Sequence, residues 1–381
     1  MKRRRILAIN NETKVLSQNS IYNKNRNITE NNRELKVYYS IPENGVNEET
    51  GLLLFIAGFG GQATSNVYKK MRNDFSDKYN LVTVQCDYFG YEFMQSEPEI
   101  VTPKIDKEQL KTAFSIKEVE EIYKDGDLNF KKFLEFASKK RQKIIAEVKA
   151  ITLEDEDNFN DMGILQAIDN VTAVLNVLNI LQDKKHSFNS KKIIIYGHSH
   201  GAYLSYLCNR YCPNLFSLII DNSAWLEPVY LNGNRYLNTY LGNLTLTTVF
   251  DYLAKNLIKD KEALNLNILY SNFKNECLII TYQGVTDNLI DHKEKEKFCK
   301  NIDNCIYNEI SKEKIDDIVF KSTNHGLNSD FIKMFDYTMS NFNIKFEKET
   351  IMNLPKEVIF KTSDHKYVIH YKNGNLTMKI L

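Results

Sequence analysis

Residues 197–201 read Gly-His-Ser-His-Gly, a serine with a glycine two positions away on either side. An apolar run, Ile193-Ile194-Ile195-Tyr196, precedes this pentapeptide, and apolar residues return at helical spacing after it. The pattern is typical of a nucleophile elbow, in which a serine occupies a strained turn between a strand and a helix. The glycines are needed because so sharp a turn brings backbones together where a Cβ would clash. Ser199 is therefore the candidate nucleophile, and an ordinary strand-to-helix turn is the alternative.

A nucleophilic serine needs a base, an acid that orients the base, and N–H donors for the oxyanion. His325 follows a predicted strand at 318–320, and Asp287 follows the predicted strand before it, at 277–282. The chain therefore supplies candidates in the order serine, aspartate, histidine. Asp221, which ends the strand after the elbow, is a rival acid. Asp287 is favoured because its strand directly precedes the histidine.

The oxyanion donors are expected at two places. The elbow helix points its unpaired N–H groups at the reaction centre, so the N–H of His200 is one candidate. The segment 58–61, Gly-Phe-Gly-Gly, follows a buried-strand run at 52–57, and the N–H of Phe59 is the other candidate. Gly60 of this loop is a candidate substrate-binding residue, and a β-branched residue in its place should distort the loop.

Two cofactor hypotheses compete with this interpretation. Gly58, Gly60 and Ala63, with Asp87 after the next strand, also match a dinucleotide-binding fingerprint, but that fingerprint leaves the elbow unexplained. The histidines beside Ser199 could suggest zinc, but they project from a tight turn without an accompanying carboxylate or cysteine. We therefore expect no cofactor and no metal. The six cysteines are scattered without CxxC pairs and are expected to be free and mostly buried.

Composition narrows the class of protein. Among 381 residues, 50 Lys and Arg nearly balance 49 Asp and Glu, so no global field would recruit nucleic acid or an anionic membrane. The apolar run after the basic amino terminus, at 6–9, is too short for a signal-peptide core, and no later segment is expected to reach membrane-spanning length. A cytoplasmic protein with neither nucleic-acid nor membrane partners is the expectation. The oligomeric state stays open.

The elements that position these residues follow an α/β pattern. Buried-strand runs at 52–57 and 81–86 enclose a helical segment at 67–79, which predicts a βαβ unit and hence a parallel sheet. Further elements are expected as edge strands at 6–9 and 35–39, a helix from 161, a strand at 218–221 and a closing helix at 331–342.

Three segments fall outside this pattern. The charged stretch 97–156 predicts a helical insertion without buried strands. The aromatic and Asn-rich stretch 225–270 predicts a cap over Ser199, with Trp225 and Tyr230 contacting substrate; the alternative is that the aromatic residues only form the core of the cap. On the first interpretation, Trp225→Ala is expected to impair activity with little loss of stability. The tail, 346–381, contains three short β runs with an Asn373-Gly374 pair suited to a hairpin turn.

In the order of these elements, roughly residues 35–345, the sequence resembles the α/β-hydrolase superfamily. The resemblance implies a mostly parallel, doubly wound sheet. We expect one domain at 1–345, which contains the insertion and the cap, followed by the C-terminal extension at 346–381. The resemblance also implies Ser199 as nucleophile, Asp287 as acid and His325 as base, with Phe59 and His200 forming the oxyanion hole. The chain is further similar to a poorly characterised group of bacterial hydrolase-like proteins associated with flagellin-glycan gene clusters.

Three functions remain open at this point. The first is a serine hydrolase acting on a small-molecule or glycan-linked ester. The second is an acyltransferase that uses the same three residues, since both reactions share the covalent step. The third is a non-catalytic binding protein of this fold, which leaves the ordered serine, aspartate and histidine without a purpose.

Overall fold

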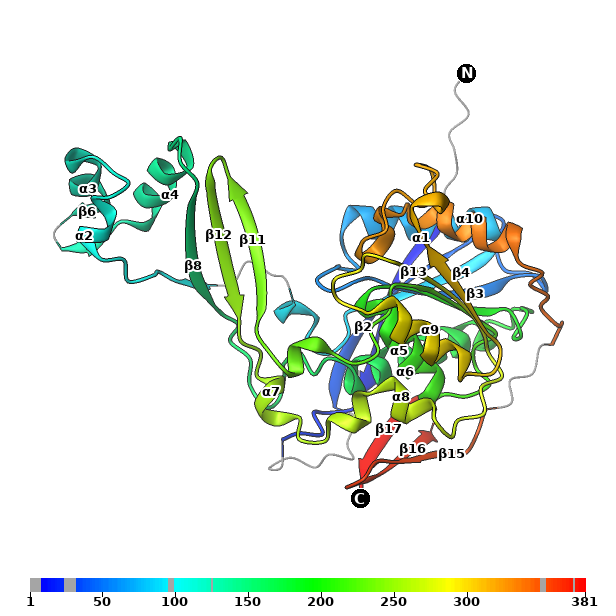
Figure 1. Cartoon of the computed structure of the whole chain (residues 1–381). Helices are drawn as coiled ribbons and strands as arrows, with labels where there is room; N and C mark the ends of the chain where they lie inside the picture. Colours follow the sequence, from blue (N-terminus) through cyan, green and yellow to red (C-terminus); the bar gives the residue numbers. More distant parts are fainter. Residues whose placement is uncertain (1–7, 24–31, 95–98, 125, 350–353, 373) are drawn as a thin grey trace.

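The computed structural model describes residues 8–23, 32–94, 99–124, 126–349, 354–372 and 374–381. Its centre is an eight-stranded sheet in the order β1-β2-β4-β3-β9-β10-β13-β14 (Figure 1). The strands are β1 (Ile9–Ser17), β2 (Arg33–Ile41), β3 (Gly51–Ile56), β4 (Leu81–Cys86), β9 (Ile193–His198), β10 (Leu218–Asn222), β13 (Leu278–Gly284) and β14 (Cys305–Ile310). β2 pairs antiparallel with β1 and β4, and all other neighbours are parallel. The expected mostly parallel α/β-hydrolase-type sheet is confirmed.

Helices cover both faces of this sheet. α5 (Ile164–Asp183), α6 (His200–Tyr211) and α9 (His292–Lys300) lie on one face, and α1 (Asn66–Tyr79) and α10 (Phe331–Asn341) lie on the other (Figure 1). The sequence of β3 is apolar throughout because both faces of the strand are buried. Leu52 and Leu54 pack in the core under α5 and α6, while Leu53 and Phe55 pack in the core under α1 and α10. A strand buried on both faces needs a continuous apolar run, which is the signal that the sequence carried.

The last strand of the sheet differs from the prediction. Residues 318–320 form no strand, because the Asp316 side chain accepts hydrogen bonds from the N–H groups of Ile318, Val319 and Phe320 and holds them in a turn. The last strand is β14, an edge strand whose residues are mostly half-buried. Its mixed sequence gives no apolar run. The expected strand at 6–9 lies largely outside the described residues, and β1 begins at Ile9.

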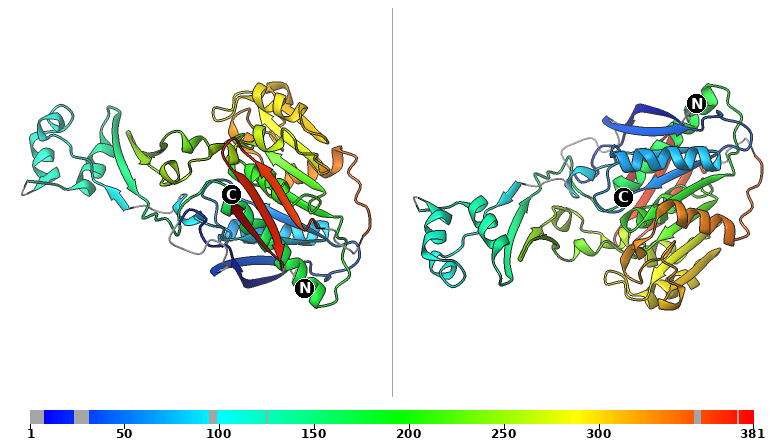
Figure 2. Two further views of the ribbon diagram at one scale, coloured as in Figure 1. Left: turned by 90° about the horizontal axis from the view of Figure 1, so that it is seen from below. Right: turned by 90° about the horizontal axis from the view of Figure 1, so that it is seen from above.

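Two segments far apart in the sequence build an arm that extends from the body (Figures 1 and 2). The arm contains a second sheet, in the order β11-β12-β8-β5. Its elements are β5 (Glu99–Val101), α2 (Lys107–Leu110), α3 (Ile116–Ile122), β6 (Tyr123–Lys124), β7 (Asp127–Leu128), α4 (Phe130–Lys139), β8 (Ile144–Ile151), β11 (Arg235–Leu241) and β12 (Leu244–Phe250). The helices pack on one face of this sheet through residues such as Phe114, Phe133 and Leu246.

The arm corrects two expectations. The insertion is not wholly helical, because β8 pairs with β12 and alternates buried and exposed residues. Its exposed positions carry charged residues such as Glu147 and Lys149, so the sequence has no continuous apolar run from which the strand could be predicted. The segment 225–270 does not simply cover the elbow either. Its hairpin joins the arm, and only the parts before and after the hairpin lie against the body, including α7 (Ala254–Leu257) and α8 (Leu266–Tyr270).

The tail forms the expected antiparallel sheet of β15 (Glu357–Lys361), β16 (Lys366–Lys372) and β17 (Asn375–Ile380). Asn373 of the predicted turn lies outside the described residues. The Phe360 ring stacks on Tyr211 of α6, with centroids 5.7 Å apart. Gln18 donates to the carbonyl of Met378 at 2.6 Å and accepts from its N–H at 2.7 Å. The tail therefore packs into the same core as α5 and α6 (Figure 2).

α5 corrects one further expectation, because its 20 residues are long and apolar enough, at a mean hydropathy of 1.5, to cross a membrane. In the structure 83% of its apolar window is buried, as suits the central helix of a core. The cysteines agree with the prediction: all six are free, and five are buried.

Candidate active site

Ser199 occupies the turn between β9 and α6 with φ 55° and ψ −119°, a backbone conformation that is costly for a residue with a side chain. The two flanking glycines are required by close contacts. A Cβ at Gly197 would lie 2.4 Å from the backbone nitrogen of Ala202, and one at Gly201 would lie 2.3 Å from the carbonyl oxygen of Ile56. The pentapeptide therefore forms the strained strand-to-helix turn that its spacing predicts.

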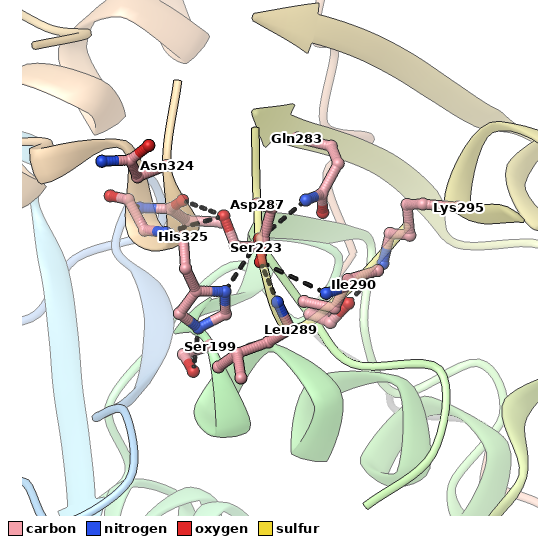
Figure 3. A network of polar contacts seen from close by, with 12 residues as sticks. Ser199, Ser223, Gln283, Asp287, Leu289, Ile290, Lys295, Asn324 and His325 are labelled. Atoms are coloured by element: carbon pink, nitrogen blue, oxygen red, sulfur yellow. Dashed lines mark hydrogen bonds and ion pairs between the residues drawn. The ribbon is translucent and has the colours of Figure 1, made fainter. Parts of the chain in front are cut away.

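The three residues in serine, aspartate, histidine order meet at this turn. Ser199 Oγ lies 2.6 Å from His325 Nε2, and His325 Nδ1 lies 2.8 Å from Asp287 Oδ2 (Figure 3). His325 sits on the short helical turn η5 (His325–Asn328), and its side chain is 18% exposed. With Nδ1 donating to the carboxylate, Nε2 is free to accept the serine proton. Both contacts are within the range that proton transfer requires.

Asp287 is buried and fully bonded. Its carboxylate accepts hydrogen bonds from the Gln283 amide at 2.8 Å and from the N–H groups of Leu289 and Ile290 at 2.8 and 3.2 Å (Figure 3). Burial raises the pKa of this carboxyl, but the His325 contact and these hydrogen bonds outweigh it, and the pKa of Asp287 lies below its ordinary value. The carboxylate thus stays ionised beside the imidazole.

The rival acid, Asp221, is engaged elsewhere. It forms an ion pair with Lys295 at 2.8 Å, and both side chains are fully buried. It also accepts from the Tyr206 hydroxyl at 2.8 Å and from the Ala224 N–H at 2.7 Å. No hydrogen bond links it to His325 among the described contacts. Asp221 therefore serves a buried ion pair beneath the site.

Several supporting residues were not predicted. The histidine loop is held to the end of β10, since Gly326 N–H donates to Ser223 Oγ at 3.1 Å. The aspartate loop is tied to the histidine loop by Thr286 and Thr323, whose hydroxyls lie 2.6 Å apart. Leu327, at φ 60°, shows that the histidine loop is strained as well. In the sequence, these supporting residues are marked only by their position next to the predicted site residues.

The expected oxyanion loop lies directly beside the elbow. Its Gly58 packs on His198, where a Cβ would lie 2.7 Å from Nδ1, and Gly60 has φ 85°, a region that favours glycine. His200 is the first residue of α6, so its N–H has no carbonyl partner within the helix. The Phe59 ring lies 5.4 Å from the His200 ring. The two predicted donor segments are therefore neighbours.

Of the two elbow histidines, His200 is fully buried and His198 is half-buried. Burial, and then the charge of His325, lowers the pKa of His198 to about 4, and burial lowers that of His200 to about 3. His200 Nε2 lies 2.6 Å from Gln166 Oε1. Within the described part of the chain, no three His, Cys, Asp or Glu side chains form a group that could hold a metal ion.

An aromatic cluster packs against the elbow and the oxyanion loop. Trp225 is only 1% exposed and contacts Phe59, His200 and Tyr230, with centroids 6.0, 5.2 and 5.5 Å apart. The Trp225 side chain therefore lies inside this aromatic cluster, whereas the side chains of Tyr230 and Phe59 keep some exposed surface. Two further tyrosines of the segment 225–270, Tyr236 and Tyr240, lie exposed on β11 of the arm.

The residues of the competing dinucleotide fingerprint have other contacts. Gly58 accommodates His198, as described above. The Asp87 carboxylate accepts a hydrogen bond from the Tyr38 hydroxyl at 2.8 Å. These contacts account for the glycine and the aspartate without a dinucleotide.

Residues 27–233, more than half of the chain, match a family model described as "Protein of unknown function (DUF2920)". The chain belongs to this family. The matched region includes the predicted oxyanion loop, most of the arm and the elbow, whereas Asp287 and His325 lie beyond it. No curated protein matches the chain.

Three solved structures illustrate the fold likeness. Est1E from Butyrivibrio proteoclasticus with ferulic acid bound is 13% identical, covers 81% of this chain and 94% of its own, and has a TM-score of 0.45. The S-formylglutathione hydrolase from Agrobacterium tumefaciens is 10% identical, with 87% and 94% covered and a TM-score of 0.44. An acylaminoacyl peptidase in complex with a chloromethyl ketone is 14% identical, with 91% and 43% covered and a TM-score of 0.48. Values this low transfer no activity, so the fold assignment rests on the strand order of this chain.

Proposed function

We propose that the protein is a serine-dependent ester hydrolase. The observation that carries the proposal is the unbroken series of short contacts from Ser199 through His325 to Asp287, built on a strained turn. A turn with only a structural role has no need of strain, a hydrogen-bonded histidine and a buried carboxylate together.

The geometry supports the following mechanism. His325 takes the Ser199 proton as the hydroxyl attacks the ester carbonyl, and Asp287 stabilises the imidazolium that forms. The N–H groups of His200 and Phe59 donate to the oxyanion of the tetrahedral intermediate. Its collapse expels the alcohol, which receives the proton from His325 and leaves an acyl group on Ser199. A water molecule, activated by the same imidazole, then releases the acid and restores the serine.

The substrate we propose is a polar, small-molecule or glycan-linked ester with a short acyl group. Large aromatic side chains, above all Trp225, fill the space beside the elbow, and Phe59 and Tyr230 offer ring surfaces. Short-chain and sugar acetates should then be hydrolysed faster than esters of long acyl chains. A clear preference for long chains would contradict this substrate class.

A fluorophosphonate probe tests the catalytic proposal. The folded protein should be labelled at Ser199, and Ser199→Ala should abolish labelling. His325→Ala should lower the rate of hydrolysis by about 10³ to 10⁶ while leaving the fold intact. His365→Ala, which removes an exposed histidine of the tail, is the matched control and should keep full activity. Absence of labelling would favour a binding protein.

The same covalent step permits acyl transfer to an acceptor hydroxyl. Consumption of an acyl donor should therefore be measured with and without sugar acceptors. Turnover that depends on the acceptor would make the protein an acyltransferase, and acceptor-independent release of acid supports the hydrolase.

A further inference from the structure

Arg235 stands out among the side chains around the oxyanion loop. It begins β11 at the base of the arm, and its guanidinium lies 4.8 Å from the centroid of the Phe59 ring and 5.4 Å from that of Phe250. Phe59 belongs to the predicted oxyanion loop and lies against His200, the residue after the nucleophile. A cation is thus held against the Phe59 ring, which in turn contacts the His200 ring.

Among the residues that the structure describes, no carboxylate neutralises this cation. Within the described residues none lies within 4.0 Å of the Arg235 guanidinium. Carboxylates on adjoining segments have other partners: Glu154 accepts from the N–H of Leu253 at 3.0 Å and from that of Asn160 at 3.0 Å, and Asp251 pairs with Lys255. A partly buried guanidinium without a counterion is costly, because burial removes water without supplying an opposite charge.

Arg235 also retains hydrogen-bonding capacity. One of its terminal nitrogens donates to the carbonyl of Met94 at 2.7 Å, and the guanidinium also interacts with the Tyr252 hydroxyl. A guanidinium carries five N–H donors in a planar fork that suits a carboxylate or a phosphate. Stacking on Phe59 and the Met94 bond fix the plane of this fork, so little entropy is lost when an anion binds.

Two aromatic side chains near the Arg235 cation keep exposed surface. Phe59 and Tyr230 contact each other edge to face, with centroids 5.5 Å apart, and both are half-buried. Together with Arg235 they present ring surfaces next to one positive charge.

We propose that Arg235 determines specificity by binding an anionic group of the ester substrate, with the rest of that substrate lying on Phe59 and Tyr230. This inference rests on the proposed hydrolase function and narrows its substrate to esters that carry a carboxylate or a comparable anion. Arg235 takes no part in the chemical step.

A matched pair of esters tests the inference: 4-acetoxybenzoate, which carries a carboxylate, and methyl 4-acetoxybenzoate, which does not. The unaltered protein should show the higher kcat/KM for the anionic ester. Arg235→Gln should lower kcat/KM for that ester about 10- to 100-fold, as expected for loss of a charge-assisted hydrogen bond, mainly through KM. For methyl 4-acetoxybenzoate, kcat/KM for hydrolysis of the acetyl ester should change less than threefold. Arg235→Lys should recover part of the selectivity, because it keeps the charge.

Arg141→Gln is the control variant, since it removes an exposed positive charge from the arm away from Phe59 and should change neither ester. Raising the salt concentration should increase KM for the anionic ester alone. An equal loss with both esters in Arg235→Gln would assign the residue a structural role and overturn the inference. A higher kcat/KM of the unaltered protein for methyl 4-acetoxybenzoate than for 4-acetoxybenzoate would also overturn the inference. Failure of the proposed function is distinct, because Ser199 would then remain unlabelled and neither ester would be hydrolysed.

Discussion

The two candidate acids make the sharpest test of the site, because the structure gives them different partners. Asp287 contacts His325 at 2.8 Å, and Asp221 contacts Lys295 at 2.8 Å in full burial. Asp287→Asn should lower kcat by about 10⁴, since the amide favours the wrong tautomer of the imidazole and cannot stabilise its charged form. Asp221→Asn should leave kcat of the folded protein within a few-fold of normal.

Of the two substitutions, Asp221→Asn should lower the stability of the fold more than Asp287→Asn does. Asp221→Asn leaves the ammonium of Lys295 buried without a counterion, which costs about 3–5 kcal/mol. An unfolding entropy of about 2.1 cal/mol/K per residue amounts to roughly 0.8 kcal/mol/K over 381 residues, so the melting temperature should fall by about 4–6 °C. Adding Lys295→Met should restore part of this loss, because the unpaired charge is then gone.

Both quantities are accessible in one set of purified variants. Turnover of a short-chain acetate gives kcat, and differential scanning calorimetry gives the melting temperature. The assignment is refuted if Asp221→Asn, while folded, loses as much activity as Asp287→Asn. It is refuted equally if Asp287→Asn retains near-normal turnover, since the carboxylate beside His325 would then have no role in the reaction.

Three further predictions follow from the same neighbourhood. Gly60→Val should lower kcat about 10²- to 10³-fold with a small change in KM, because valine cannot readily adopt φ 85° and the displaced loop loses an oxyanion donor; an unchanged kcat would make the loop a simple turn. Trp225→Ala should lower the free energy of unfolding in urea by about 3–5 kcal/mol, contrary to the expectation from the sequence, because the side chain is 1% exposed. A loss below about 1 kcal/mol would contradict its place inside the aromatic cluster. His200 has a pKa lowered to about 3, so below pH 6.5 the unfolded chain binds a proton that the native state excludes, and stability falls with pH down to about 3. The free energy of unfolding of the unaltered protein, measured against that of His200→Phe, should therefore drop by up to about 2 kcal/mol between pH 7.5 and pH 5, and a constant difference would show that His200 is not buried in its neutral form.

The parts of the site that could be predicted depend on short-range patterns. The elbow is contained in five residues and its flanking apolar runs, so Ser199 and the strain around it follow from local sequence. Asp287 and His325 could be assigned because parallel strands end at one edge of a sheet, which brings the loops after them together. His325 lies beside Ser199 although the strand predicted before it does not exist, since η5 still follows the last strand, β14.

What escaped prediction depends on partners distant in the sequence. β8 pairs with β12 through residues such as Val148 and Thr248, and neither strand has an apolar run that identifies it alone. β14 is half-exposed at the sheet edge, so its pattern is weak. The hydroxyls of Ser223 and Thr286 act only through backbone and side-chain groups of the histidine loop. No spacing rule anticipates such contacts.

The arm changes how the cap should be understood. The sequence places aromatic residues after β10 and suggests that they cover Ser199 together, but the structure divides them. Trp225 and Tyr230 pack on Phe59 beside the elbow, whereas Tyr236 and Tyr240 stand exposed along β11. Arg235 marks the point of division, because it opens β11 while its guanidinium still lies over Phe59. The base of the arm therefore borders the site.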